Sequence, residues 1–206
     1  MSKHNKKKDP NEKPPGYRQK LLADLKAKYP HYGLKSSLLG ALFLLGIILT
    51  IWEVNIYEMT FISVYIPLSI WIFTGLVMTP VLKKTFNIYC FNPYSPGRTP
   101  IFFHWVFNIA SFGGILVFLF MWANQTFTGQ SKKVFAANIN SYGHLASSKH
   151  SCATPYVIID FMYTQKELMF PCGTEVEKYK IVYIESEKGL FGFDVITNKT
   201  LIKDQW

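Results

Sequence analysis

Residues 36–52 read SSLLGALFLLGIILTIW and contain no acidic or basic side chain. Two comparable stretches follow at residues 59–82 and 101–123. A helix needs about 20 apolar residues, within a range of roughly 17–25, to cross a bilayer. None of the three stretches has the polar face that a helix on a soluble domain requires. The sequence therefore predicts three transmembrane helices, at about 36–52, 59–82 and 101–123, within residues 34–123.

The composition agrees with this interpretation. The chain has 206 residues, of which 49% are hydrophobic and only 17% are charged, whereas a soluble domain has roughly 25% charged residues. These values exclude a disordered chain, a coiled coil and a disulfide-dense mini-protein. We expect no cleaved signal peptide, because the basic region before the first stretch is far longer than a usual n-region and two more stretches follow.

The charges alternate along the chain. The net charge is +7 over residues 1–35, −2 over 53–58, +3 over 83–100 and +1 over 123–206. Lys and Arg near the ends of spans stay on the cytoplasmic side. The pattern therefore predicts a cytoplasmic N-terminus and a C-terminal region on the outer side of the membrane, either periplasmic or extracellular.

The N-terminal region is basic. Residues 1–16 are rich in Lys and Pro and are predicted to be a disordered tail. Residues 17–30 predict a basic amphipathic juxtamembrane helix that lies on the inner leaflet. Its membrane-binding side chains would be Arg18, Lys20, Lys26 and Lys28. Nucleic acid is not an expected partner, because no recognition fold accompanies the lysines.

Residues 130–206 have a different pattern. Short runs rich in Val, Ile, Tyr and Phe lie between clusters of turn residues, which predicts strands at 134–139, 156–161, 167–170, 179–184 and 191–196. Residues 163–166 would form a hairpin loop. We therefore predict an α+β membrane protein, with three transmembrane helices followed by a small antiparallel β meander or sandwich domain outside the membrane.

The outer domain contains two of the three cysteines. Cys152 precedes one predicted strand and Cys172 follows the next, so the hairpin brings them together and predicts a disulfide worth about 3 kcal/mol. A redox site would need C-x-x-C, which is absent. The low-ranking alternative is a zinc site built from His144, His150, Cys152 and Cys172, but the spacing matches no common ligand pattern. We expect no metal and no cofactor.

The spans contain few polar groups. His104 lies beside Trp105 and is interpreted as an interfacial residue, and Pro67 is expected to kink the second span. Small residues that would allow close contact between helices are Gly40, Gly46, Gly113 and Gly114.

Residues 151–196, which include SCATPYVIIDF and LMFPCGTEVEKYKIVYIESEKGLFGFDVI, resemble the C-terminal ends of small uncharacterised bacterial membrane proteins of the Bacteroidetes type. Such proteins have a few spans and then a compact extracytoplasmic β domain with two cysteines. The resemblance covers under a quarter of the chain and implies no activity. It implies a bacterial inner membrane with the C-terminal domain in the periplasm.

No catalytic or nucleotide-binding motif occurs in the sequence. The favoured function is an accessory or protein-binding component that acts through its aromatic-rich outer domain, with the bilayer and a protein as partners. One alternative is a membrane subunit of a transport or secretion assembly that acts through its spans. The other, less favoured, is a metal- or redox-active membrane enzyme.

Overall fold

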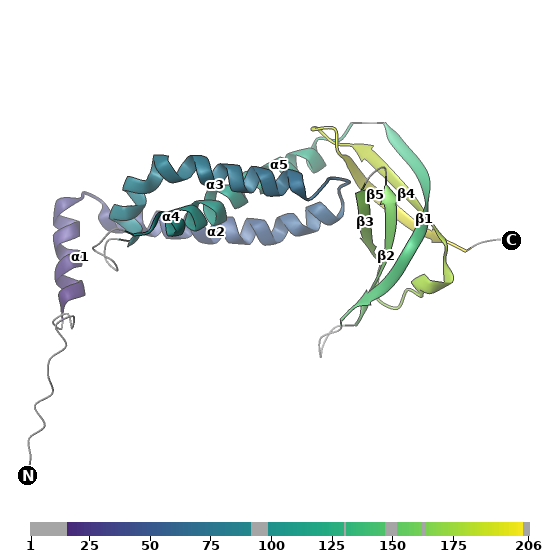
Figure 1. The fold of residues 1–206 in the computed structure, drawn as a ribbon, viewed down its shortest axis with the longest axis horizontal. Helices are drawn as coiled ribbons and strands as arrows, with labels where there is room; N and C mark the ends of the chain where they lie inside the picture. The colour runs from purple at the N-terminus through teal and green to yellow at the C-terminus, as the bar shows by residue number, and fades with distance from the viewer. Residues whose placement is uncertain (1–15, 92–98, 130, 147–151, 162–163, 204–206) are drawn as a thin grey trace, which may run out of the picture.

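The computed structural model describes residues 16–91, 99–129, 131–146, 152–161 and 164–203. Long helices come first and a curled, five-stranded antiparallel sheet follows at one end of them (Figure 1), which confirms the predicted α+β architecture. The helices are α1 (Tyr17–Lys28), α2 (Tyr32–Glu58), α3 (Tyr65–Phe86), α4 (Ile101–Asn108) and α5 (Gly114–Thr126). The strands are β1 (Lys132–Leu145), β2 (Thr154–Phe161), β3 (Thr164–Met169), β4 (Ile181–Lys188) and β5 (Asp194–Ile202).

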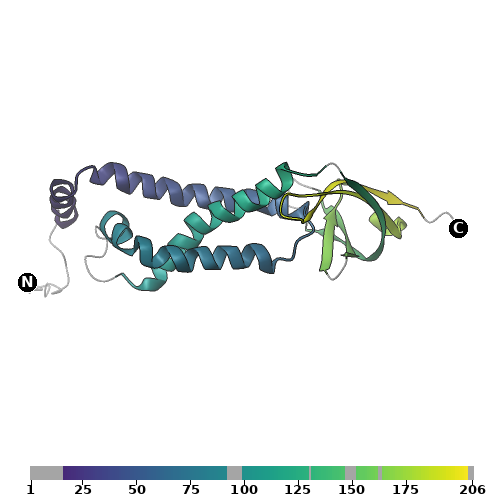
Figure 2. The same ribbon diagram turned by 90° about the horizontal axis from the view of Figure 1, so that it is seen from above.

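Three helical stretches are long and apolar enough to cross a membrane: Tyr32–Glu58, Tyr65–Phe91 and Ile101–Thr126. The second is α3 continued by a π-helical turn, η1 (Asn87–Phe91). The third is a single helix in which another π-helical segment, η2 (Ile109–Gly113), joins α4 to α5. Figure 2 shows this third helix crossing between the other two, so that α4 lies beside α3 and α5 beside α2.

The first two long helices differ in extent from the predicted spans 36–52 and 59–82. Helix α2 continues to Glu58, because residues 53–58 contain no Gly or Pro that would stop it. The predicted acidic connection is therefore helical. Helix α3 begins only at Tyr65. Pro67 consequently lies in the first turn of α3, where its missing N–H needs no partner, and the expected mid-span kink does not arise there.

Small residues allow the helices to touch. A Cβ atom added to Gly114 would lie 2.5 Å from the carbonyl oxygen of Gly46, and one added to Gly113 would lie 3.1 Å from the carbonyl oxygen of Trp71. Gly40, by contrast, has open space around it. The predicted close contact is thus confirmed at Gly46, Gly113 and Gly114, and it is wrong at Gly40.

Helix α1 lies across the end of the bundle that is opposite the sheet (Figure 1). The predicted amphipathic helix over 17–30 is only partly correct. At 100° per residue, position 28 falls within about 20° of Leu21, while positions 20 and 26 fall on other sides of the helix, so basic positions surround the helix instead of sharing one side. The predicted tail, residues 1–16, lies outside the described residues except for Gly16.

The sheet has the order β3-β2-β1-β4-β5, with every neighbouring pair antiparallel. This order corrects the predicted meander, because β4 pairs with β1 and not with β3. The reason is the length of β1: its first half pairs with β4 and its second half with β2, with an irregularity between Ile139 and Ser141. Residues 164–166, predicted as a loop, belong to β3.

One face of the sheet forms a hydrophobic core. Val157 and Ile159 of β2, Leu168 of β3, and Val182 and Ile184 of β4 are almost fully buried. Cys152 and Cys172 form the predicted disulfide, which ties the beginning of β2 to the end of β3. So small a core is marginal by itself, and this crosslink supplements it.

Candidate functional site

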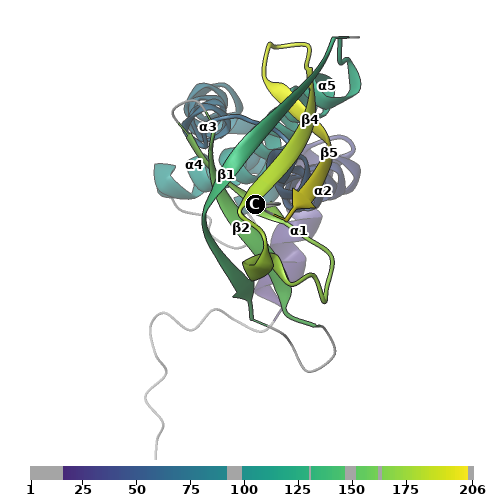
Figure 3. The same cartoon turned by 90° about the vertical axis from the view of Figure 1, so that its right-hand side faces the viewer.

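The sheet is joined to the bundle through the segment that connects α2 and α3. Thr60 pairs with Val195 of β5 as an isolated antiparallel bridge. The Phe61 N–H donates to the carbonyl oxygen of Asp194 at 2.8 Å, and the Ile196 N–H donates to that of Met59 at 2.8 Å. The connection between two helices therefore extends the sheet at its β5 edge, and Figure 3 shows the sheet covering this end of the bundle.

Asn124 ties the third helix to the same joint. Its side chain is fully buried. Its Nδ2 donates to the Phe193 carbonyl oxygen at 3.2 Å, and its Oδ1 accepts from the Phe191 N–H at 3.0 Å. A Cβ atom on Gly189 would collide with the Asn124 carbonyl oxygen, so only glycine fits where the β4–β5 turn meets α5.

Lys166 of β3 completes the joint from the opposite edge of the sheet. It lies on the same face as Leu168, is 5% exposed, and its Nζ donates to the Tyr57 carbonyl oxygen at 2.6 Å. The Nζ also lies 4.2 Å from the centre of the Tyr57 ring, within cation–π range. Burial lowers the pKa of Lys166 to about 8, against the opposing effect of the Glu58 carboxylate, and the nearby Lys199 lowers it further.

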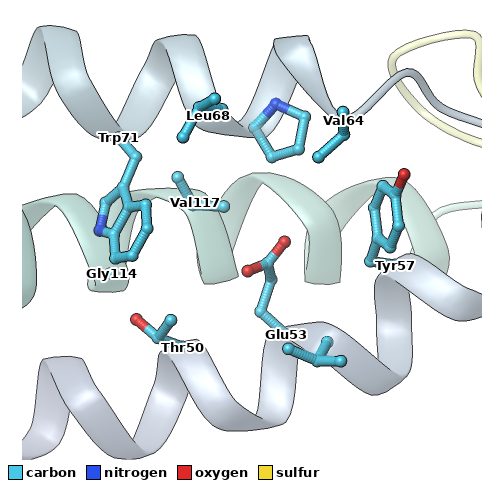
Figure 4. Close-up of a pocket in the computed structure, with 10 residues that line it drawn as sticks. Thr50, Glu53, Tyr57, Val64, Leu68, Trp71, Gly114 and Val117 are labelled. Carbon is cyan, nitrogen blue, oxygen red and sulfur yellow. The ribbon is translucent and has the colours of Figure 1, made fainter.

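Just below this joint, a groove of about 180 Å³ opens between α2 and α3, with α5 behind it. Figure 4 shows the Glu53 carboxylate of α2 pointing into the space between these helices, with Leu68 and Trp71 of α3 on the opposite side. Val117 and Gly114 of α5 form the back wall. Glu53 is thus a half-buried acid in a largely apolar groove.

The other end of the bundle contains a buried polar cluster. His104 Nε2 donates to Asn87 Oδ1 at 3.1 Å. Asn108 Nδ2 donates to the His104 carbonyl oxygen at 2.7 Å and to Thr79 Oγ1 at 3.3 Å. His104 Nδ1 and Asn108 Oδ1 are buried without a hydrogen-bond partner among the described residues. His104 is therefore buried within the bundle, where α4 packs against α3 and η1, while its predicted level at the membrane interface stays a prediction.

The predicted membrane-binding lysines, Lys20, Lys26 and Lys28, are exposed on α1, and Arg18 lies in the same helix. Lys35 lies nearby on α2, and its Nζ is 3.4 Å from Tyr89 Oη. The basic residues at the end of α3, Lys83 and Lys84, are at this same end of the bundle. The described basic residues of the helical part are thus gathered away from the sheet.

The predicted alternative metal ligands do not form a site in the part of the chain that is described. Cys152 and Cys172 are bonded to each other, so neither offers a thiolate. His144 is exposed on β1, and His150 lies outside the described residues. No group of three His, Cys, Asp or Glu side chains suitable for a metal occurs among the described residues.

The face of the sheet that points away from the core has exposed apolar side chains. Val134 is 63% exposed, Tyr183 is 42% exposed and Ile202 is 38% exposed. Ala136 and Tyr183 are register partners on the strands β1 and β4. We call Val134, Ala136, Tyr183 and Ile202 the outer patch. Most of the aromatic residues that suggested a binding surface lie elsewhere: Phe170 is buried, and Phe191 stacks on Phe120 of α5.

A search of protein-family models, of curated proteins and of solved structures finds no match to this chain. The geometry of its own residues therefore carries the functional argument.

Sequence reasoning missed Glu53, Asn108, Asn124 and Lys166. Lys166 had a usable signal, because it alternates with Leu168 and so shares the inward face of a strand. Glu53 and Asn124 stand at the ends of apolar stretches, where polar residues ordinarily mark the membrane boundary.

Proposed function

We propose that this chain is an accessory membrane subunit that holds its β domain in a fixed orientation outside the membrane and binds a protein through the outer patch. In this proposal the N-terminus is cytoplasmic, the membrane is a bacterial inner membrane, and the β domain is periplasmic. The observation that carries the proposal is the joint: all three long helices contribute backbone or side-chain hydrogen bonds or packing to it, and a domain on a flexible linker would need none.

The proposed orientation is supported by charge and by the cysteines. The described lysines of the helical part lie at the end of the bundle away from the sheet, as the preference of basic residues for the cytoplasmic side requires. The disulfide is at the other end, and structural disulfides persist in oxidising compartments. Both observations favour an outer location for the sheet.

The outer patch is the part of the β domain best suited to a protein partner. Its side chains project from β1, β4 and β5 on the face opposite the core, so they make no contribution to the joint. Exposed aromatic and aliphatic residues next to polar neighbours, here Glu185, Asn198 and Thr200, are typical of the centre and rim of an interface.

The test is site-specific photo-crosslinking in the native membrane. A crosslinking amino acid at Tyr183 of the full-length protein should give a discrete adduct with one partner, and Val134→Asp should abolish that adduct without reducing the amount of protein. The same amino acid at Glu177, exposed but outside the patch, should give none. Equal adducts at both positions, or an adduct insensitive to Val134→Asp, would contradict the proposal.

A second candidate function, a membrane subunit that acts through its spans in transport or secretion, is favoured by one observation. The buried polar cluster at His104 and Asn108 has hydrogen-bonding atoms without partners among the described residues. Polar groups inside a membrane bundle are costly and commonly functional. This function would predict that His104→Phe abolishes activity of the assembly while leaving crosslinking at Tyr183 intact.

A further inference from the structure

Glu53 has no cationic partner among the residues that the structure describes. No ion pair or hydrogen bond joins its carboxylate to another described residue. Lys166, the buried lysine of the joint, donates from its Nζ to the Tyr57 carbonyl oxygen and lies over the Tyr57 ring. A carboxylate among apolar side chains is costly unless a cation or hydrogen-bond donors accompany it. The Glu53 carboxylate in the groove therefore needs a positively charged partner that the described residues do not supply.

The groove is open toward the surroundings of the bundle. Val54 of α2 and Val64 at the start of α3 are each 51% exposed, and Leu68 is 40% exposed. These three residues form the lips of the groove, while Gly114 and Val117 of α5 form its floor. If the helices cross a membrane, the molecules that meet this opening are lipids.

From these observations we infer that the groove binds a membrane lipid with a primary ammonium headgroup, such as phosphatidylethanolamine, whose ammonium pairs with Glu53. A primary ammonium has three N–H donors for the carboxylate. The rings of Tyr57 and Trp71, which line the same groove, offer flat apolar surface to an acyl chain.

The position of Glu53 along α2 suits a headgroup. It precedes the end of the helix at Glu58 by five residues, which is about 8 Å along the axis. The sheet begins immediately beyond, at Met59 and Thr60. Glu53 is therefore near the level at which the bundle meets the sheet, and the part of the groove around Trp71 and Gly114 extends deeper, where acyl chains lie.

The dimensions of the groove argue against a transmembrane helix as the occupant. Its walls run from Thr50 to Tyr57 on α2 and from Val64 to Trp71 on α3, a length of about 10 Å. A partner helix that crosses the membrane would pack along most of about 30 Å.

The experiment measures lipid contact at Trp71 in the full-length protein. Trp71 is kept as the sole tryptophan by replacing Trp52, Trp105, Trp122 and Trp206 with Phe. The protein is reconstituted in phosphatidylcholine vesicles that contain increasing fractions of either brominated phosphatidylethanolamine or brominated phosphatidylglycerol. The dependence of Trp71 quenching on lipid composition should show that the groove binds phosphatidylethanolamine about tenfold more tightly than the unlabelled phosphatidylcholine. That ratio is the size expected of one charge-assisted hydrogen bond. Phosphatidylglycerol should show no preference.

Two variants make the result specific. Glu53→Gln keeps the shape of the side chain and should remove the preference. Val54→Phe should reduce quenching by either lipid because it fills the groove from its lip. Glu58→Gln is the matched control, since this acid is on the same helix but does not line the groove, and it should behave as the unsubstituted protein.

A preference that survives Glu53→Gln, or equal quenching by the two brominated lipids, would overturn the inference. Quenching that falls as the protein-to-lipid ratio rises would also overturn it, by indicating that a second copy occupies the groove. None of these outcomes depends on the protein partner proposed above.

Discussion

The two ends of the helical bundle satisfy their polar groups in different ways. At the sheet end, Asn124 uses both its amide oxygen and its amide nitrogen, and Lys166 donates to a backbone carbonyl oxygen. At the α1 end, the helix side-chain atoms His104 Nδ1, Trp105 Nε1 and Asn108 Oδ1 are buried without partners among the described residues. In the sheet, Ser186 Oγ and Asp194 Oδ1 are also buried without a hydrogen-bond partner in the described part of the chain, although Asp194 Oδ1 lies 3.8 Å from Lys133 Nζ. A buried polar group that lacks a partner is uncommon in native proteins and calls for an explanation.

The difference teaches that Asn124 and Lys166 connect helices to strands in a structural joint at the sheet end, whereas the buried helix side chains at the α1 end retain unused hydrogen-bonding capacity. Both π-helical segments, η1 and η2, also flank the cluster at the α1 end. Such segments occur frequently at functional sites, because they re-aim side chains within an otherwise regular helix. Stability should therefore depend most on contacts at the middle and the sheet end of the bundle.

The largest effect is expected where helix backbones touch. Gly114→Leu would place a side chain against the Gly46 carbonyl oxygen and Thr50 Oγ1, so α2 and α5 could not keep their spacing. We expect a loss of about 3–5 kcal/mol, or failure to fold, because overpacking cannot be relieved against backbone atoms. Thermal unfolding of the detergent-solubilised protein measures it.

Gly40→Leu is the control for that substitution. It makes the same chemical change in a long apolar helix, but a Cβ atom at Gly40 meets nothing within 4 Å. It should leave the unfolding temperature nearly unchanged. If both variants lose the same stability, the added leucine itself and not the helix contact would be responsible, and the contrast between packed and open glycines would fail.

Much of the fold was predictable from the sequence for a simple reason. Each prediction that succeeded rests on a signal that is local in the chain: apolar stretches for the three helices, alternation for the strands, and a hairpin that brings Cys152 to Cys172. Strand order was not predictable in this way. It depends on β1 being long enough to serve two partners, and β1 meets β4 across about 50 residues of chain.

The candidate sites were the least predictable part. Asn124 meets Phe191 across 67 residues, and Lys166 meets Tyr57 across 109 residues. No spacing along the sequence indicates such pairs. Glu53 was predicted to lie in a connection between spans, because an acid beside an apolar stretch normally marks the end of that stretch. Instead the helix continues to Glu58 and brings the Glu53 carboxylate into a groove.

An intermediate effect is expected at the joint. Asn124→Ala removes two hydrogen bonds and leaves the Phe191 N–H and the Phe193 carbonyl oxygen without their partner. We expect a loss of about 2 kcal/mol, since unpaired buried groups keep their desolvation cost. The turn at Gly189 should also become sensitive to limited proteolysis. Asn198→Ala, on the exposed part of β5, is the control and should change neither measurement.

The effect that tests the electrostatics of the joint is a change of stability with pH. The pKa of Lys166 is lowered to about 8 in the folded protein, mainly by burial, whereas an unfolded lysine titrates near 10.5. Between these two values the unfolded chain binds more protons than the folded one, so the free energy of unfolding should rise as the pH increases from about 8 to about 10.5. Below about pH 8 the cost of burying the charge is fully present. Lys199, whose pKa is also lowered by burial, adds a slope of the same sign.

Lys166→Met should therefore reduce, without abolishing, the rise of the free energy of unfolding with pH, as measured by chemical unfolding across this pH range. A slope unchanged in Lys166→Met would mean that the Lys166 ammonium is solvated, and the joint would then lack its contact between β3 and α2.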